Sequence, residues 1–191
     1  MVASAGGSVG KWLNGRRFRH QQVVSEKGLQ MTDIQEQLDA LLDRVRVLED
    51  RAAIGDVLTA YGPAVDAGDA EAVGRLWAPD AVYDLDIGVL NGRAAITEMV
   101  RTSPHQDYID GGCGHLLDPI NIRLDGDTAV ATCHSLLVRR NTDEDSFRVW
   151  RASANRFELA RMDGQWKITR RTARLLDGSA DARELLGRAS D

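Results

Sequence analysis

Apolar residues recur along residues 34–52 at alternating spacings of four and three. The members of this series are Ile34, Leu38, Leu41, Val45, Leu48 and Ala52. These spacings place the apolar side chains on one narrow face, so they predict an amphipathic helix. Three heptads are short for a coiled coil, and such a helix more commonly packs on its own domain or on a partner subunit. The helical pattern continues to Tyr61, and Gly62-Pro63 is expected to break it.

The next segments alternate between short helices and a strand. Gly68 is typical of a helix end and Asp69 of the N-cap that follows it. We therefore predict a helix over residues 70–77, a strand over 81–87, a turn at Asn91-Gly92 and a helix over 94–101.

Two hairpins follow in the second half of the chain. The first is expected to join strands 116–124 and 129–139 through Asp125-Gly126-Asp127, and the second to join strands 148–160 and 166–175 through Met162-Asp163-Gly164. Helices followed by long antiparallel strands predict the α+β class. Strands of this length can curl around a helix and leave a pocket inside.

Composition divides the chain into three parts. Residues 1–30 are rich in small residues and carry five basic residues against one acidic residue, without the apolar core of a signal peptide, so we expect a disordered basic leader. Residues 31–178 are expected to form the folded domain and residues 179–191 a C-terminal tail.

Charge and motif content exclude several function classes. The net charge of -5 argues against nucleic-acid binding, and no apolar run reaches the roughly 18 residues of a membrane helix. Cys113 and Cys133 form no disulfide framework, which favours the reducing cytoplasm. Phosphate-loop, dinucleotide and serine-hydrolase motifs are absent from the sequence, so we expect no cofactor.

Two residues are the strongest candidates for chemistry. His115 follows the glycine-rich run Gly111-Gly112-Cys113-Gly114, just before a predicted strand. Asp66 lies near the C-terminus of a predicted helix, where the helix dipole disfavours a carboxylate. A hydrogen bond to His115 would hold Asp66 there and would fix the tautomer of the imidazole. Each residue also has a purely structural explanation.

Strand alternation offers further candidates. His134 and Arg140 share one face of the predicted strand with Leu136 and Val138, and would enter the same cavity if that face is internal. On the next strand Ser153 and Asn155 share a face with Arg151, which is either a solvated face or a hydrogen-bonding wall. A zinc site is disfavoured because adjacent Cys133 and His134 point to opposite faces.

The order of several segments resembles the SnoaL-like branch of the nuclear-transport-factor-2-like superfamily. These segments are Arg51-Ala-Ala-Ile54, Val65-Asp66-Ala67-Gly68-Asp69, Leu76-Trp-Ala-Pro-Asp-Ala-Val-Tyr83, Gly92-Arg93, His115, Asp125-Gly-Asp-Thr-Ala129 and Asp163-Gly-Gln-Trp-Lys-Ile-Thr-Arg170. Together they span about residues 34–177. The resemblance implies a cone-shaped α+β barrel, in which N-terminal helices pack into a curved, mostly antiparallel sheet around an apolar pocket. It also implies a homodimer or homotrimer.

Two enzyme types of this superfamily, scytalone dehydratase and hexachlorocyclohexane dehydrochlorinase, pair an Asp with a His, and Asp66 and His115 stand at matching positions. Ser153-Ala154-Asn155 matches a Ser-Ala-Asn of the dehydratase. Val65 and Leu85 replace its two pocket tyrosines, and Arg140 replaces its second histidine, which argues against scytalone as the substrate.

The resemblance therefore implies a cofactor-free lyase, dehydratase or isomerase that acts on a small apolar cyclic metabolite through catalytic Asp66 and His115. The substrate-binding candidates are Asn155, Ser153, Arg140, His134, Leu85, Leu136, Val138 and Trp77. The alternative is a non-catalytic relative: a ligand-binding module, or the structural small subunit of a ring-hydroxylating dioxygenase.

Overall fold

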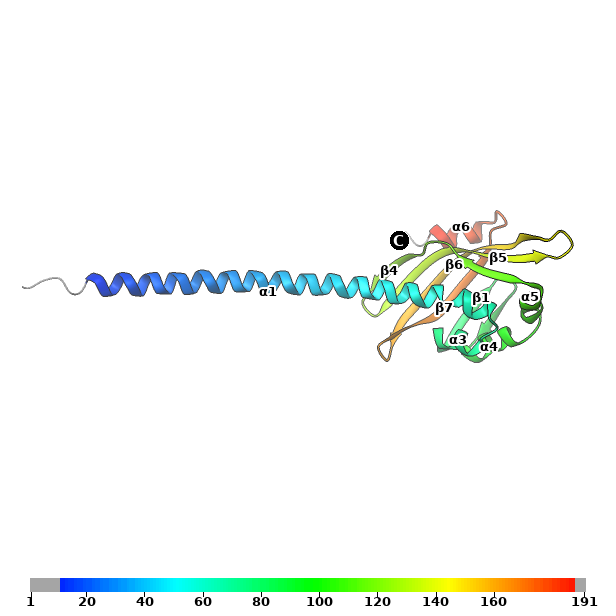
Figure 1. Ribbon diagram of the computed structural model, residues 1–191, viewed down its shortest axis with the longest axis horizontal. Coiled ribbons are helices and arrows are strands. Elements are labelled where there is room, and N and C mark those ends of the chain that lie inside the picture. The colour runs from blue at the N-terminus through cyan, green and yellow to red at the C-terminus, as the bar shows by residue number, and fades with distance from the viewer. Residues whose placement is uncertain (1–10, 188–191) are drawn as a thin grey trace, which may run out of the picture. The chain divides into compact units, whose positions relative to one another are not determined.

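The computed structural model describes the backbone of residues 11–187 and the side chains of residues 31–187. The chain has two compact units, residues 1–48 and residues 49–191. Figure 1 shows the ribbon. No helix among the described residues is long and apolar enough to cross a membrane.

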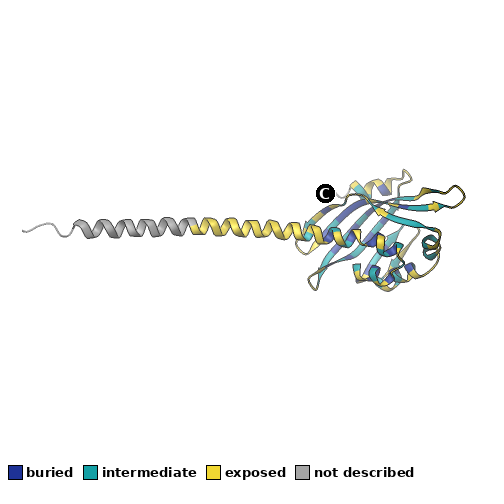
Figure 2. Ribbon diagram, in the orientation of Figure 1, coloured by how far each residue is buried: buried dark blue, intermediate teal, exposed yellow. Residues whose placement is uncertain are grey.

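The helix predicted from residue 34 is part of a longer one, α1 (Lys11–Thr59). It begins inside the segment for which composition predicts disorder, because residues 11–30 contain no proline and several good helix formers. Residues 1–10 of that expected leader lie outside the described residues. In residues 31–48 the apolar members of the predicted series are exposed (Figure 2).

Four short helices follow α1 in the second unit. They are α2 (Tyr61–Asp66), α3 (Ala70–Leu76), α4 (Arg93–Arg101) and α5 (His105–Gly111), of which α5 was not predicted. The expected N-cap is confirmed, since Asp69 accepts a hydrogen bond from the Ala72 amide at 2.8 Å. Pro63 lies in the first turn of α2, where its missing N–H costs no helical hydrogen bond.

Within residues 11–187, seven strands form one curved, unclosed and mostly antiparallel sheet, in the order β2-β1-β7-β6-β5-β3, with β4 also paired to β5. Their bounds are β1 (Trp77–Leu85), β2 (Gly88–Asn91), β3 (Cys113–Leu117), β4 (Asn121–Asp125), β5 (Thr128–Asn141), β6 (Ser146–Met162) and β7 (Gln165–Leu175). β1 and β7 are parallel, and the other pairs are antiparallel. The predicted strand 116–124 is thus two strands, because Pro119 lies between them and cannot donate to the ladder.

The core lies between the helices and the concave face of the sheet. Ile54 and Leu58 of α1 are fully buried against residues of the sheet such as Phe157 and Ile168. Asp50 joins this end of α1 to the second hairpin, because it accepts hydrogen bonds from Arg161 at 2.6 Å and from Trp166 at 3.1 Å.

The end of the chain adds one more helix. The segment 179–191, expected as a tail, contains α6 (Ala180–Gly187), which contacts β6 and β7. Ala182 of α6 is buried.

Candidate active site

Asp66 and His115 meet where α2 crosses β3. The Asp66 carboxylate contacts His115 Nδ1 at 2.6 Å and accepts a hydrogen bond from the His115 backbone amide at 2.8 Å. The predicted hydrogen bond is therefore confirmed. With Asp66 ionised, Nδ1 carries the proton of the neutral imidazole and Nε2 holds the free lone pair.

A glycine allows this close approach. A Cβ atom on Gly62 would lie 2.3 Å from the His115 carbonyl oxygen, which is shorter than any normal contact. Gly62 therefore lets the backbone of α2 lie directly against β3. This contact brings Asp66, one turn later on α2, to the imidazole.

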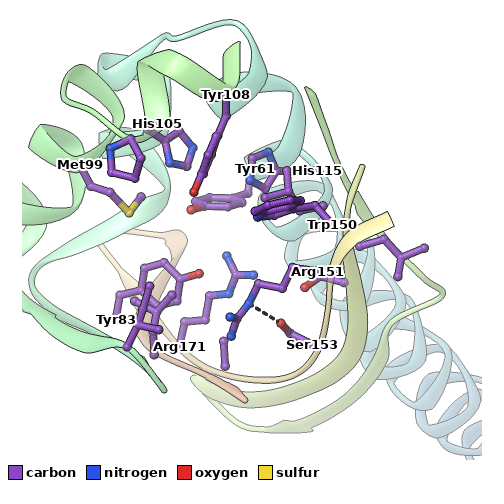
Figure 3. Close-up of a pocket in the computed structure, with 17 residues that line it drawn as sticks. Tyr61, Tyr83, Met99, His105, Tyr108, His115, Trp150, Arg151, Ser153 and Arg171 are labelled. Atoms are coloured by element: carbon purple, nitrogen blue, oxygen red, sulfur yellow. Dashed lines mark hydrogen bonds between the residues drawn. The ribbon is translucent and has the colours of Figure 1, made fainter. Parts of the chain in front are cut away.

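His115 lines a cavity of about 260 Å³ on the concave side of the sheet (Figure 3). The walls are mostly apolar and aromatic, with Tyr61, Tyr83, Tyr108 and Trp150 around the opening that the figure shows. A pocket with apolar walls and a few polar groups is the usual form of a small-molecule site.

A second imidazole lies beside the first. The rings of His105 and His115 are stacked, with centroids 5.3 Å apart and planes 15° apart. Burial, together with the electrostatic influence of the neighbouring His115, lowers the pKa of His105 to about 4, so His105 is neutral at pH 7. Its Nε2 atom is buried and has no hydrogen-bond partner among the described residues.

A buried cation faces the cavity from β7. The Arg171 side chain is 4% exposed, and its guanidinium lies 4.7–5.0 Å from the ring centres of Tyr61, Tyr83 and Phe157. Within residues 31–187 no carboxylate pairs with it, and its Nη1 atom has no hydrogen-bond partner. An unpaired buried charge is costly, so this position favours an anionic group in the cavity.

Asn155 supports this guanidinium and does not reach the cavity. Its Oδ1 accepts hydrogen bonds from Arg171 Nε at 3.0 Å and Nη2 at 2.8 Å, and its Nδ2 donates to Ser135 Oγ at 2.9 Å. Ser153 lines the cavity, where its hydroxyl accepts from Arg151. The internal face of β6 is therefore the hydrogen-bonding wall that was one of the two alternatives.

The predicted face of β5 is corrected by the structure. Ser135, Leu136 and Leu137 line the cavity, whereas His134 does not line it and is paired with Asp118 at 2.6 Å. Alternating small and apolar residues occur on both faces of this strand, so its pattern did not distinguish them.

Three other candidate substrate-binding residues lie outside the cavity. Arg140 pairs with Asp145 at 3.1 Å and does not line the cavity, nor does Val138. Trp77 is fully buried in the core behind Tyr61 and Tyr83. Leu85 and Leu136 do line the cavity, as expected.

One group of described residues has the composition of a metal site. Potential ligand atoms of Asp66, Cys113 and His115 all lie within 4.8 Å of one another. Cys113 Sγ donates to the Asp66 carboxylate at 3.6 Å, and burial, with Asp66 nearby, raises the pKa of this thiol to about 11. The three groups thus form a hydrogen-bonded cluster, and a metal ion would have to displace its protons.

Sequence reasoning missed His105, Arg171 and the three tyrosines. Trp166 and Ile168 are buried, and strict alternation from them would bring Arg170 to the inner face. A register shift between β6 and β7 at Glu158/Leu159 turns Arg171 inward in its place.

Several solved structures are similar to this chain in sequence and in fold. An NTF2-like protein with a cystatin-like fold from Novosphingobium aromaticivorans is 41% identical, with a TM-score of 0.74, and the match covers 76% of this chain and 94% of that one. A protein from the same organism, named as an aromatic ring hydroxylase, is 31% identical over 68% of this chain and 90% of its own (TM-score 0.54). The hexachlorocyclohexane dehydrochlorinase LinA-type3 from Novosphingobium barchaimii is 19% identical over 70% and 90% (TM-score 0.60), and shows the shared fold alone.

No curated protein matches the sequence. The model of the SnoaL-like domain matches residues 46–172, which hold the Asp66–His115 pair, Arg171 and every residue that lines the cavity except Ala173. The chain therefore belongs to the SnoaL-like domain family, within the NTF2-like fold.

Proposed function

We propose that this protein is a cofactor-independent lyase or isomerase that removes a proton from a small cyclic substrate. The observation that carries the proposal is the 2.6 Å contact between Asp66 and His115 at the edge of an apolar cavity. A carboxylate on Nδ1 orients the ring and stabilises the imidazolium, which makes Nε2 an effective general base.

Arg171 extends the proposal to the charge that develops during the reaction. In an elimination, His115 takes a proton from the carbon next to a carbonyl, and the electrons of that C–H bond form the new C=C bond. The bond to the leaving group breaks, and the leaving group departs with its electron pair. Arg171 would stabilise the negative charge that develops on the carbonyl oxygen or on the leaving group.

The test uses a panel of cyclic ketones with a β-hydroxyl or β-halide group, followed by the absorbance of the conjugated product. With a substrate found, His115→Ala is expected to lower kcat/KM by about 10²–10⁴-fold. Arg171→Met is expected to lower kcat by about 10²–10³-fold. Full kcat/KM in His115→Ala would refute the assignment of the base.

The chain offers a matched control for the pair. His134 contacts Asp118 in the same way, with Nδ1 at 2.6 Å and the backbone amide at 2.7 Å, but outside the cavity. His134→Ala and Asp118→Asn remove the same type of interaction and are expected to leave kcat/KM unchanged. Asp66→Asn is expected to lower it.

A second candidate is a non-catalytic structural subunit of a ring hydroxylase. The 31% identity to the protein named as an aromatic ring hydroxylase supports it. Stable copurification with a Rieske-type large subunit encoded by a neighbouring gene, together with no turnover of the panel, would favour this second candidate.

A further inference from the structure

The helix before the SnoaL-like domain carries an uncovered apolar face. We name this face the α1 seam, and its members are Met31, Ile34, Leu38, Leu41, Val45, Leu48 and Ala52. The six members before residue 49 are 46–72% exposed. They follow the spacing of heptad positions a and d, which meet a second helix in a coiled coil.

Several polar residues beside the seam are paired within the helix. Gln35 donates to Asp39 at 2.9 Å, and Arg46 pairs with Asp43 at 2.9 Å. The apolar residues have no such partner, and a continuous exposed apolar stripe marks a binding surface.

The seam is an addition to the domain that the family shares. The SnoaL-like match begins at residue 46, so five of the seven seam residues precede it. Within the second unit, Ile54 and Leu58 are buried, whereas Ala52 is exposed. The packing of the domain therefore accounts for the end of α1 but not for the seam.

We propose that the α1 seam pairs with the same seam of a second copy, as a parallel and in-register two-stranded coiled coil. Charge supplies the first argument. In a parallel pair, the g position of one helix faces the e position five residues later on the other. Arg44 then faces Glu49 of the second copy, and the same contact repeats by symmetry. Neither residue forms an ion pair within residues 31–187.

The same charges disfavour the antiparallel arrangement, in which g positions face g positions. The g positions of the seam are Gln37, Arg44 and Arg51, so both charged members are basic. The residues at the core positions of the last heptads also favour a coiled coil of two helices, because the β-branched Val45 occupies position a and Leu41 and Leu48 occupy position d.

Two valines provide a matched test of the seam. Val45 and Val47 are both 46% exposed, but only Val45 belongs to the seam. In light scattering and sedimentation equilibrium on the full chain, Val45→Asp is expected to weaken self-association at least tenfold, and Val47→Asp to leave it unchanged. A wild-type monomer at tens of micromolar, or equal masses for wild type and Val45→Asp, would overturn the proposal.

Cross-linking tests the direction of the two helices. In a parallel in-register pair each d residue meets its own copy, so Leu41→Cys is expected to form an intermolecular disulfide rapidly under copper-phenanthroline oxidation. Val47→Cys and the wild-type chain, which retains Cys113 and Cys133, are the controls. Cross-linking of Val47→Cys as fast as Leu41→Cys would contradict the register.

Exchanging the two charges tests the proposed contact between Arg44 and Glu49 of the second copy. Arg44→Glu sets a second carboxylate against Glu49 of the second copy, and this repulsion is expected to weaken association. Adding Glu49→Arg restores opposite charges at the two positions and is expected to restore association. Failure of the double variant to recover would rule out the Arg44–Glu49 contact and with it the parallel arrangement.

Discussion

Substituting Gly62 tests how closely α2 lies against β3. The added Cβ would stand 2.3 Å from the His115 carbonyl oxygen, whereas ordinary contacts begin at 3.4 Å. The two elements must therefore separate by about 1 Å. Overpacking of this kind typically costs about 1–3 kcal/mol.

Gly55→Ala is the matched reference for this change. Gly55 lies in α1, and a Cβ there would meet nothing within 4 Å. Both substitutions gain the helical preference of alanine, about 1 kcal/mol, so Gly55→Ala is expected to stabilise the protein. The difference between the two variants then isolates the contact with His115. We expect Gly62→Ala to be less stable than Gly55→Ala by about 1–3 kcal/mol, or about 2–12 °C in Tm for a protein of this size.

Urea unfolding followed by circular dichroism measures this difference, and the slope m reports whether the native state has changed in compactness. A separation of 1 Å would also lengthen the 2.6 Å contact between Asp66 and His115 beyond hydrogen-bond range, so turnover should fall in Gly62→Ala alone. Equal unfolding free energies for the two variants would refute the reasoning.

Three further predictions concern caps and charges. Asp69→Ala is expected to lower the unfolding free energy by about 1 kcal/mol in the same urea assay, because it removes the N-cap of α3. Asp69→Asn should retain most of the stabilisation that the N-cap provides. The pKa of His105 is lowered from 6.5 to about 4, so between pH 6.5 and pH 4 the imidazole is protonated in the unfolded chain but not in the folded one. The unfolding free energy should therefore fall as the pH drops from 6.5 to 4, and it should fall less steeply in His105→Gln. Hydrogen bonds from Arg161 and Trp166 hold the pKa of Asp50 below 3.8, so its contribution to stability is present above pH 3.8 and is lost as the pH falls through the lowered pKa of the folded state. Asp50→Asn should therefore destabilise the protein at pH 7 and progressively less as the pH falls below 3.8, which thermal unfolding over a series of pH values would test.

The local signals in the sequence predicted the local structure well. The N-cap at Asp69 is confirmed, and the second hairpin turns where expected, with positive φ angles at Asp163 and Gly164. The Asp66–His115 contact was also accessible, because an acid at a helix C-terminus needs a partner.

Sequence reasoning was wrong where side-chain direction depends on pairing between strands. One register shift, at Glu158/Leu159, decides that Arg171 rather than Arg170 faces inward, and no local pattern in β7 signals it. His105 was missed for a different reason: α5 is a single short helix without a buried residue, so it has no apolar periodicity to detect.

The contact between Asn155 and Arg171 has a consequence for the lifetime of the protein. An aspartate at position 155 would neutralise the buried guanidinium and stabilise the empty fold, but it would also cancel the positive charge offered to a ligand. The native amide holds Arg171 in place without neutralising it. The ligand-free protein is therefore expected to be less stable than its packing allows, and an anion bound in the cavity would supply the missing charge. The supply of ligand would then set how much folded protein persists, as well as how fast it works.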